Sequence, residues 1–112
     1  MLVLGDPVLD VYVHGTTHRR SREAPVLIVR EDEREYRLGG AANTAANLSS
    51  LGAQTQHLGP VGLDDAAGWL EEELNRAGSE LLEGPRQDVT RTKTRILAGG
   101  VHTTKQQMLR LD

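Results

Sequence analysis

Two glycines, followed by small residues and an asparagine, form the segment of this sequence best suited to bind a small polar molecule. Gly39 and Gly40 end a charged stretch, and Asn43 follows in a predicted helix that begins near Ala42. Glycines let the backbone approach a ligand closely, and a helix start offers unpaired backbone N–H groups. The amides of Asn43 and Asn47, one turn apart, can bond to hydroxyl groups. The same pattern is equally typical of a tight turn that packs a helix against a sheet.

Several other functions are excluded by motif and composition. No Lys-Ser or Lys-Thr follows the glycines at P-loop spacing, and the third glycine of the dinucleotide fingerprint is missing. The four histidines lack the spacing of zinc ligands, and with no cysteine the chain has neither a thiolate ligand nor a disulfide framework. The net charge of −3 argues against a nucleic-acid-binding protein.

A carboxylate and two cations are further candidates for binding. Asp10 follows a short apolar strand predicted at 2–4, at the edge where open α/β sheets bind ligands, and it can accept hydrogen bonds from two sugar hydroxyls. In a strand predicted at 90–97, Lys93 and Arg95 share one face with Arg91. Aligned cations without a counter-charge are unfavourable unless water or an anion lies opposite them. We predict that Lys93 or Arg95 helps to hold the phosphate of a phosphorylated sugar, the alternative being a solvated edge strand.

The elements that must position these residues alternate between strands and helices. Apolar spacing predicts helices over about 42–51 and 65–77, each ended by a glycine. The predicted strands cover residues 2–4, 10–15, 26–30, 35–38, 54–59, 79–82, 90–97 and 104–111. Those at 26–30 and 35–38, joined by a charged turn at 31–34, are expected to form a hairpin-like flap. The alternation indicates a layered α/β sheet.

The spacing of the small residues resembles the first signature of the PfkB/ribokinase family of sugar kinases at every specified position. The matching residues are Gly39, Gly40, Asn43, Ala45, Gly52 and Gly62. Other motifs that add to the likeness are Gly5–Asp10, Glu23–Val26, Val61–Asp65, Thr92–Leu97 and Gln106–Asp112. Together they resemble the N-terminal part of the heptose-phosphate kinase subgroup, which serves ADP-heptose synthesis. Two departures leave another sugar phosphate open as the acceptor: Arg22 replaces a proline, and the turn at 99–105 is longer than in the subgroup.

The resemblance implies an α/β fold for residues 1–112, the N-terminal part of a ribokinase-like layered structure with a small β-lid at about 11–38. It implies that Asp10 and Asn43, with the two glycines before Asn43, bind a sugar. It also implies that the lid covers the sugar and pairs with the lid of a second subunit in a homodimer. The complete enzyme would use ATP and Mg²⁺ to phosphorylate the anomeric hydroxyl of a heptose phosphate.

The family's catalytic base is the aspartate of a Gly-Ala-Gly-Asp motif, which does not occur in these 112 residues. We therefore expect this chain to be the acceptor-binding part of a kinase, without catalytic residues or a bound cofactor of its own, and inactive as a truncated piece. A non-catalytic sugar- or anion-binding module is the alternative. No apolar stretch is long enough to span a membrane, and no basic segment precedes the first strand. A soluble, cytoplasmic protein is expected.

Overall fold

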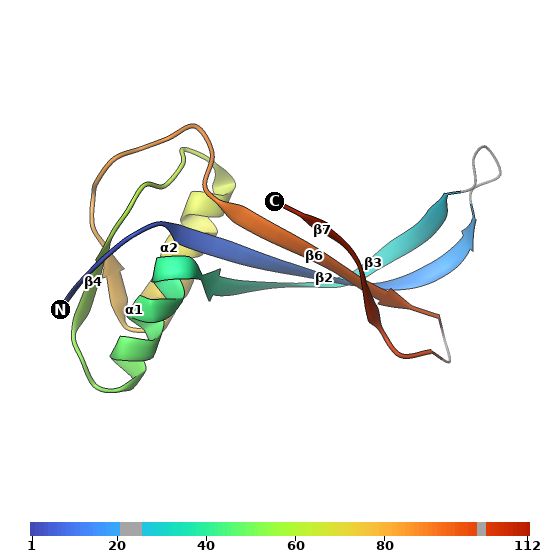
Figure 1. Ribbon diagram of the computed structural model, residues 1–112, viewed down its shortest axis with the longest axis horizontal. Helices are drawn as coiled ribbons and strands as arrows, with labels where there is room; N and C mark the ends of the chain where they lie inside the picture. The colour runs from blue at the N-terminus through green and yellow to red at the C-terminus, as the bar shows by residue number, and fades with distance from the viewer. Residues whose placement is uncertain (21–25, 101–102) are drawn as a thin grey trace.

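The strands lie in two sheets, with two helices between them, over the residues that the computed structural model describes, which are 1–20, 26–100 and 103–112 (Figure 1). The parallel sheet has the strand order β1-β4-β5 and contains β1 (Leu2–Leu4), β4 (Thr55–Leu58) and β5 (Ser79–Leu81). The sheet that we call the lid sheet has the order β3-β2-β6-β7 and contains β2 (Pro7–Arg20), β3 (Leu27–Gly39), β6 (Thr92–Gly99) and β7 (Gln106–Leu111). The α/β class predicted from the sequence is confirmed.

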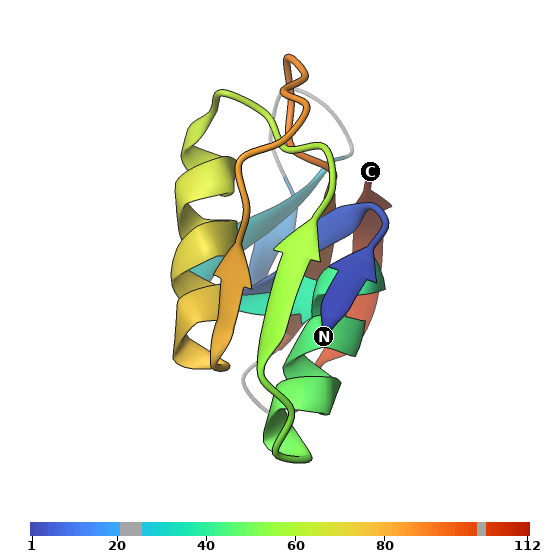
Figure 2. The same cartoon turned by 90° about the vertical axis from the view of Figure 1, so that its left-hand side faces the viewer.

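Both helices cover one face of the parallel sheet, the face that is turned toward the lid sheet (Figure 2). They are α1 (Gly40–Ser50) and α2 (Asp65–Arg76), close to their predicted bounds. Gly52 and Gly78 follow them with φ angles of 96° and 87°. This left-handed backbone favours glycine, so the predicted helix ends are confirmed together with their cause.

The hydrophobic core lies where the helices meet the near end of the lid sheet. Leu70 and Leu74 of α2 are fully buried, and the alternate residues Leu9, Val11 and Val13 of β2 belong to the same cluster. The alternation follows from strand geometry, in which successive side chains lie on opposite faces. β2 thereby ties the lid sheet to the body, by which we mean the parallel sheet and both helices.

The strand β3 differs from the prediction. The predicted turn at 31–34 is wrong, because one uninterrupted strand runs from Leu27 to Gly39. The four charged residues include no glycine, proline or asparagine to reverse the chain. They stay extended because their backbone pairs with β2, while neighbouring side chains pair with each other, as Arg34 Nε does with Glu31 Oε1 at 2.6 Å. The predicted hairpin of 26–30 with 35–38 is therefore wrong, because both segments belong to β3 and the strand that pairs with them is β2.

The lid sheet extends beyond residues 11–38, because β6 and β7 also lie in it. β6 runs parallel to β2, with Lys93 opposite Asp10, and β7 continues the sheet in the antiparallel direction. The sheet projects from the body and gives the molecule dimensions of 53 × 31 × 16 Å (Figure 1). The motif residues Glu23, Ala24 and Pro25, the departure at Arg22, and residues 101–102 of the longer turn lie outside the described residues.

Candidate functional site

Asp10 and Gly39 approach each other closely across β2 and β3. Asp10 follows β1 in the chain, as predicted, but it lies within β2, which leaves the parallel sheet. A Cβ atom on Gly39 would be 2.8 Å from Asp10 Oδ2, closer than real side-chain contacts allow. The φ angle of Gly39 is −130°, a value that any residue adopts, so space beside the Asp10 carboxylate, rather than backbone conformation, favours glycine here. The first glycine of the family signature therefore makes room for the Asp10 carboxylate.

Gly40 and Asn43 lie in the first turn of α1. Gly40 has a φ angle of 56°, and a Cβ atom there would be 2.7 Å from the carbonyl oxygen of Asp6. The backbone N–H of Ala41 donates to that same oxygen at 3.1 Å. Asn43 and Asn47 are exposed on successive turns, so a ligand could reach both amides. The tight-turn role considered for the glycines is thus confirmed, while contact with a ligand stays a prediction.

Arg95 lies beside Asp10 on the polar face of the lid sheet. Its Nη1 is 3.5 Å from Asp10 Oδ1, and the two side chains are 24% and 19% exposed. Both atoms are buried, and neither has a hydrogen-bond partner among the described residues. Buried charged atoms without hydrogen bonds are costly. The two atoms compensate each other's charge at ion-pair distance, and a polar ligand could bond to either of them only if the pair moved apart.

Tyr12 and Arg37, which residue type and spacing alone did not mark as candidates, extend this face. The guanidinium carbon of Arg37 lies 4.8 Å from the centroid of the Tyr12 ring, and that of Arg95 lies 5.4 Å from it. Such cation–π contacts hold both guanidinium groups close to the ring. The available signal was the period of the strand, because residues two apart, such as Asp10 and Tyr12, share a face.

Two of the three cations expected on one face of the strand predicted at 90–97 have carboxylate partners. Arg91 Nε lies 3.3 Å from Asp6 Oδ2, and Arg95 faces Asp10 in the same way. The parallel pairing of β6 with β2 brings carboxylates from distant parts of the sequence alongside these cations, which spacing within one strand cannot show. Lys93 lies opposite Asp10 in this register. A role for Lys93 or Arg95 in holding a phosphate stays a prediction.

A hollow of about 550 Å³ opens beside Lys93. Its lining residues are Asp6, Val8, Gln87, Val89, Thr90, Arg91, Thr92, Lys93 and Asp112. Hydrogen bonding from Arg110 lowers the pKa of Asp112, and the nearby charges of Lys93 and Arg95 lower that pKa further. Gln87 Nε2 is buried and has no hydrogen-bond partner among the described residues. The hollow therefore offers charges of both signs and an unpaired amide donor.

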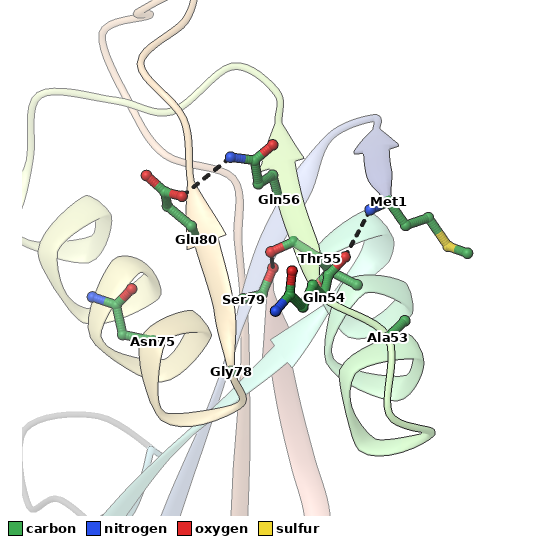
Figure 3. Close-up of a pocket in the computed structure, with 9 residues that line it drawn as sticks. All are labelled: Met1, Ala53, Gln54, Thr55, Gln56, Asn75, Gly78, Ser79 and Glu80. Atoms are coloured by element: carbon green, nitrogen blue, oxygen red, sulfur yellow. Dashed lines mark hydrogen bonds between the residues drawn. The ribbon is translucent and has the colours of Figure 1, made fainter.

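Another hollow, of about 580 Å³, lies at the edge of the parallel sheet where β4 and β5 begin (Figure 3). Its polar groups bond to one another: Gln56 Nε2 donates to Glu80 Oε2 at 3.2 Å, and the Met1 amino group donates to the Gln54 carbonyl oxygen at 2.7 Å. Open α/β sheets bind ligands at the opposite edge, outside the carboxyl ends of the strands. None of the predicted site residues lines this hollow.

Clusters of metal-ligating side chains and long apolar helices are both absent from the described part of the chain. Within residues 1–20, 26–100 and 103–112, no three histidine, aspartate or glutamate side chains are grouped so that they could hold a metal ion. Over the same ranges, no helix has the length and apolar character needed to cross a membrane.

The arrangement of the body and the lid sheet occurs in solved carbohydrate kinases. A carbohydrate kinase from Agrobacterium tumefaciens superposes with a TM-score of 0.74 at 27% identity, over 98% of this chain and 34% of that one. Ribokinase from Arabidopsis thaliana, solved with ribose and ATP, superposes with a TM-score of 0.62 at 20% identity, over 96% of this chain and 34% of that one. These likenesses define the fold class as ribokinase-like.

The family follows from the sequence comparisons. The profile of the pfkB family of carbohydrate kinases matches residues 2–106, and the chain belongs to this family. It is 45% identical to the bifunctional protein HldE of Nitrosococcus oceani, over 100% of this chain and 23% of that protein. It is 42% identical to the bifunctional protein HldE of Pseudomonas aeruginosa, with the same coverage of 100% and 23%. The chain thus spans about a quarter of the length of these curated relatives.

Proposed function

We propose that this chain is the sugar-binding part of an ATP-dependent carbohydrate kinase that phosphorylates the anomeric hydroxyl of a heptose phosphate. The observation that carries the proposal is the Asp10 carboxylate, which lies against Gly39 on a side chain that is 19% exposed, with its Oδ1 3.5 Å from Arg95 Nη1. A carboxylate in this position accepts hydrogen bonds from neighbouring hydroxyls and so orients a sugar ring. The exposed amide of Asn43 at the start of α1 supplies further donors and acceptors.

We propose that the acceptor sugar already carries a phosphate. Arg37 and Lys93 each pair in register with Asp10, and Arg95 pairs with Tyr12, two residues further along β2. All three cations therefore lie on the same face of the sheet as Asp10. Arginine binds phosphate through two parallel N–H donors, and lysine binds it as a point charge. The 42% and 45% identities to HldE proteins, with the resemblance to heptose-phosphate kinases, support a heptose as the sugar.

We propose ATP with Mg²⁺ as the phosphoryl donor and the cytoplasm as the site of action. Phosphoryl transfer needs a base near the acceptor hydroxyl, donors for the developing charge and a metal–nucleotide site. The base motif Gly-Ala-Gly-Asp does not occur in the 112 residues, so these catalytic roles are assigned to no residue of this chain. The proposed tasks of Asp10 and its neighbours are to bind and orient the acceptor.

The proposal is tested by measuring both binding and phosphate transfer with the same preparation. Calorimetry with a heptose phosphate should show binding, weakened about tenfold in Asp10→Asn because a hydrogen bond to a charged group is lost. Asp88→Asn, an exposed position outside the site, is the matched control. Binding without transfer of phosphate from ATP would favour the alternative, a non-catalytic sugar- or anion-binding module. Absence of binding in the unmodified chain would contradict the proposal and favour an inactive fragment.

We also propose that the lid sheet pairs with that of a second copy of the chain. Leu109 and Leu111 of β7 are 51% and 53% exposed, and Ile28 of β3 is 40% exposed. β7 is an edge strand, and an edge that exposes apolar side chains is prone to pair with another chain. Sedimentation should show a dimer that dissociates in Leu109→Asp. A monomeric unmodified protein at high concentration would contradict this proposal without bearing on sugar binding.

A further inference from the structure

Asp64 does more in this structure than begin α2. Its Oδ1 accepts a hydrogen bond from the backbone N–H of Ala67 at 3.1 Å, which caps the helix. The same carboxylate also binds Thr90, which precedes β6: the Thr90 hydroxyl donates to Oδ1 at 2.6 Å, and the Thr90 backbone N–H donates to Oδ2 at 2.9 Å. Burial alone would raise the pKa of Asp64, but the hydrogen bonds from Thr90 and Ala67 outweigh it and lower that pKa.

Thr90 is held from a second side by Gly62, the last glycine of the family signature. The backbone N–H of Gly62 donates to Thr90 Oγ1 at 2.9 Å, and Thr90 is 1% exposed. A Cβ atom on Gly62 would overlap the backbone nitrogen of Thr90, so no other residue fits without displacing the chain. The hydroxyl of Thr90 thus donates once and accepts once, with both partners in the segment that leads into α2.

This clamp lies immediately before the strand that carries the candidate phosphate-binding residues. Arg91 follows Thr90, and its carbonyl oxygen accepts from the backbone N–H of Leu9 at 2.9 Å, which starts the pairing of β6 with β2. The next pairs in that register place Lys93 opposite Asp10. A shift of the strand by one residue would turn Lys93 and Arg95 to the opposite face of the sheet.

We propose that Asp64 and Thr90 are positioning residues, which fix the register of β6 on β2 and so set Lys93 and Arg95 beside Asp10 for a phosphorylated sugar. The clamp connects the start of α2, which belongs to the body, to the strand of the lid sheet that carries the cations. This inference rests on the proposed function for its ligand. It adds two residues that act through the position of β6, and it gives the final glycine of the signature a structural purpose.

The clamp can be broken without removing the helix cap. Asp64→Asn keeps one side-chain oxygen to accept from Ala67, and asparagine caps helices as well as aspartate does. It loses the second oxygen, so the bonds from Thr90 cannot all form. Thr90→Val removes the hydroxyl at nearly constant volume, and Thr90→Ser restores it. Asp65→Asn, at the exposed neighbouring position, removes the same charge without touching the clamp.

Two measurements on the full chain then decide the matter: hydrogen exchange of residues 89–95, and the Kd for a heptose phosphate against the same heptose without its phosphate. Asp64→Asn and Thr90→Val should speed exchange in that segment and weaken heptose-phosphate binding about tenfold, with a smaller loss for the neutral heptose. Thr90→Ser and Asp65→Asn should resemble the unmodified chain in both measurements.

The clamp is refuted if exchange at 89–95 is unchanged in Asp64→Asn and Thr90→Val. It is equally refuted if exchange rises while both sugars are weakened by the same factor, because the clamp would then serve stability alone. Failure of the proposed function has a different signature, namely no binding of heptose phosphate by the unmodified chain. The positioning role toward the phosphate would fall with it, while faster exchange would still establish the structural tether.

Discussion

The body and the lid sheet are held together by different kinds of contact. In the body, side chains such as Leu70 and Leu74 are fully buried against each other and against α1 and β2. In the lid sheet, the polar face includes Asp10 of β2 and Arg95 of β6, an ion pair whose side chains are 19% and 24% exposed. Burial of apolar surface stabilises the body, whereas the polar face keeps charged atoms that the chain itself does not fully satisfy.

The strand β2 belongs to the lid sheet and also contributes side chains to the core that it shares with the body. Leu9 and Val11 point into the core, while Asp10 and Tyr12, the residues between and after them, point to the polar face. Along this one strand, residues that pack in the core alternate with residues that face the proposed binding site. Substitutions on the apolar face should alter the free energy of unfolding, and those on the polar face should alter ligand affinity.

The largest effect is expected in the body. Leu70→Ala should lower the free energy of unfolding by about 2–5 kcal/mol, because it leaves a cavity in a fully buried cluster. Urea unfolding followed by the fluorescence of Trp69, the single tryptophan, which stacks on Tyr36 at 4.8 Å, measures this loss. Leu63→Ala is the control, since Leu63 is 79% exposed and should change stability by less than about 0.5 kcal/mol. Equal losses in the two variants would show that the body core is placed wrongly.

A smaller and more selective effect is expected at the glycine beside Asp10. Gly39→Ala places a Cβ atom 2.8 Å from Asp10 Oδ2, so the carboxylate must move. We expect affinity for a heptose phosphate to fall about tenfold or more, equivalent to roughly 1–3 kcal/mol of overpacking at the site. Gly68→Ala is the control, because nothing lies within 4 Å of a Cβ atom there and alanine favours the helix. Unchanged affinity in Gly39→Ala, measured by calorimetry, would remove Asp10 from the site.

The sequence predicted the body better than the lid sheet, for a physical reason. Helix ends depend on local chemistry, so Gly52 and Gly78 could be identified from the sequence as the residues that end α1 and α2. The course of β3 through 31–34 depends on backbone pairing with β2, which no local signal announces. The ion pair of Arg91 with Asp6 joins residues far apart in the chain and follows only from the parallel pairing of β6 with β2.

The candidate site shows the same division. Asp10 and Gly39 could be selected from residue type and spacing, but their contact of carboxylate with backbone required the pairing of β2 with β3. Tyr12 could have been selected as a candidate, because residues two apart in a strand, such as Asp10 and Tyr12, share a face. The bonds between Asp64 and Thr90 depend on an irregular segment before β6, and residue spacing gives no indication of such a contact.

The ion pairs of the lid sheet differ in burial, which ranks their energies. A double-mutant cycle on Asp10 and Arg95 should give a coupling of about 1–2 kcal/mol, because both side chains are mostly buried. The same cycle on Glu35 and Arg37, whose side chains are 38% and 62% exposed at 2.9 Å, should give about 0.5 kcal/mol or less. Urea unfolding of the single and double variants measures both. A larger coupling for the exposed pair would contradict the ranking of these two ion pairs by their burial.

The smallest effect concerns a histidine inside the body. His57 of β4 is fully buried, and neither ring nitrogen has a hydrogen-bond partner among the described residues. Burial lowers the pKa of His57, against a weaker opposing contribution from the Gly5 backbone. The unfolded chain, with a histidine pKa near 6.5, therefore binds more protons than the folded chain just below that pH. Stability is complete above pH 6.5 and falls as the pH drops toward the lower pKa of the folded state.

Between about pH 7 and pH 6 this histidine should cost about 0.7 kcal/mol of stability or less, because only part of the titration falls in that interval. Urea unfolding at both pH values, compared between the unmodified chain and His57→Leu, isolates the contribution, since all other groups titrate in both proteins. His14→Gln is the matched control on the polar face of the lid sheet, where His14 lies 3.9 Å from Glu35 and is not enclosed in the core. Loss of the difference in His57→Leu, with His14→Gln like the unmodified chain, would assign the pH dependence to the body; if His57→Leu keeps the full pH dependence, the burial of His57 is not its cause. The body would then not be the region whose stability depends on protonation between about pH 6 and pH 7.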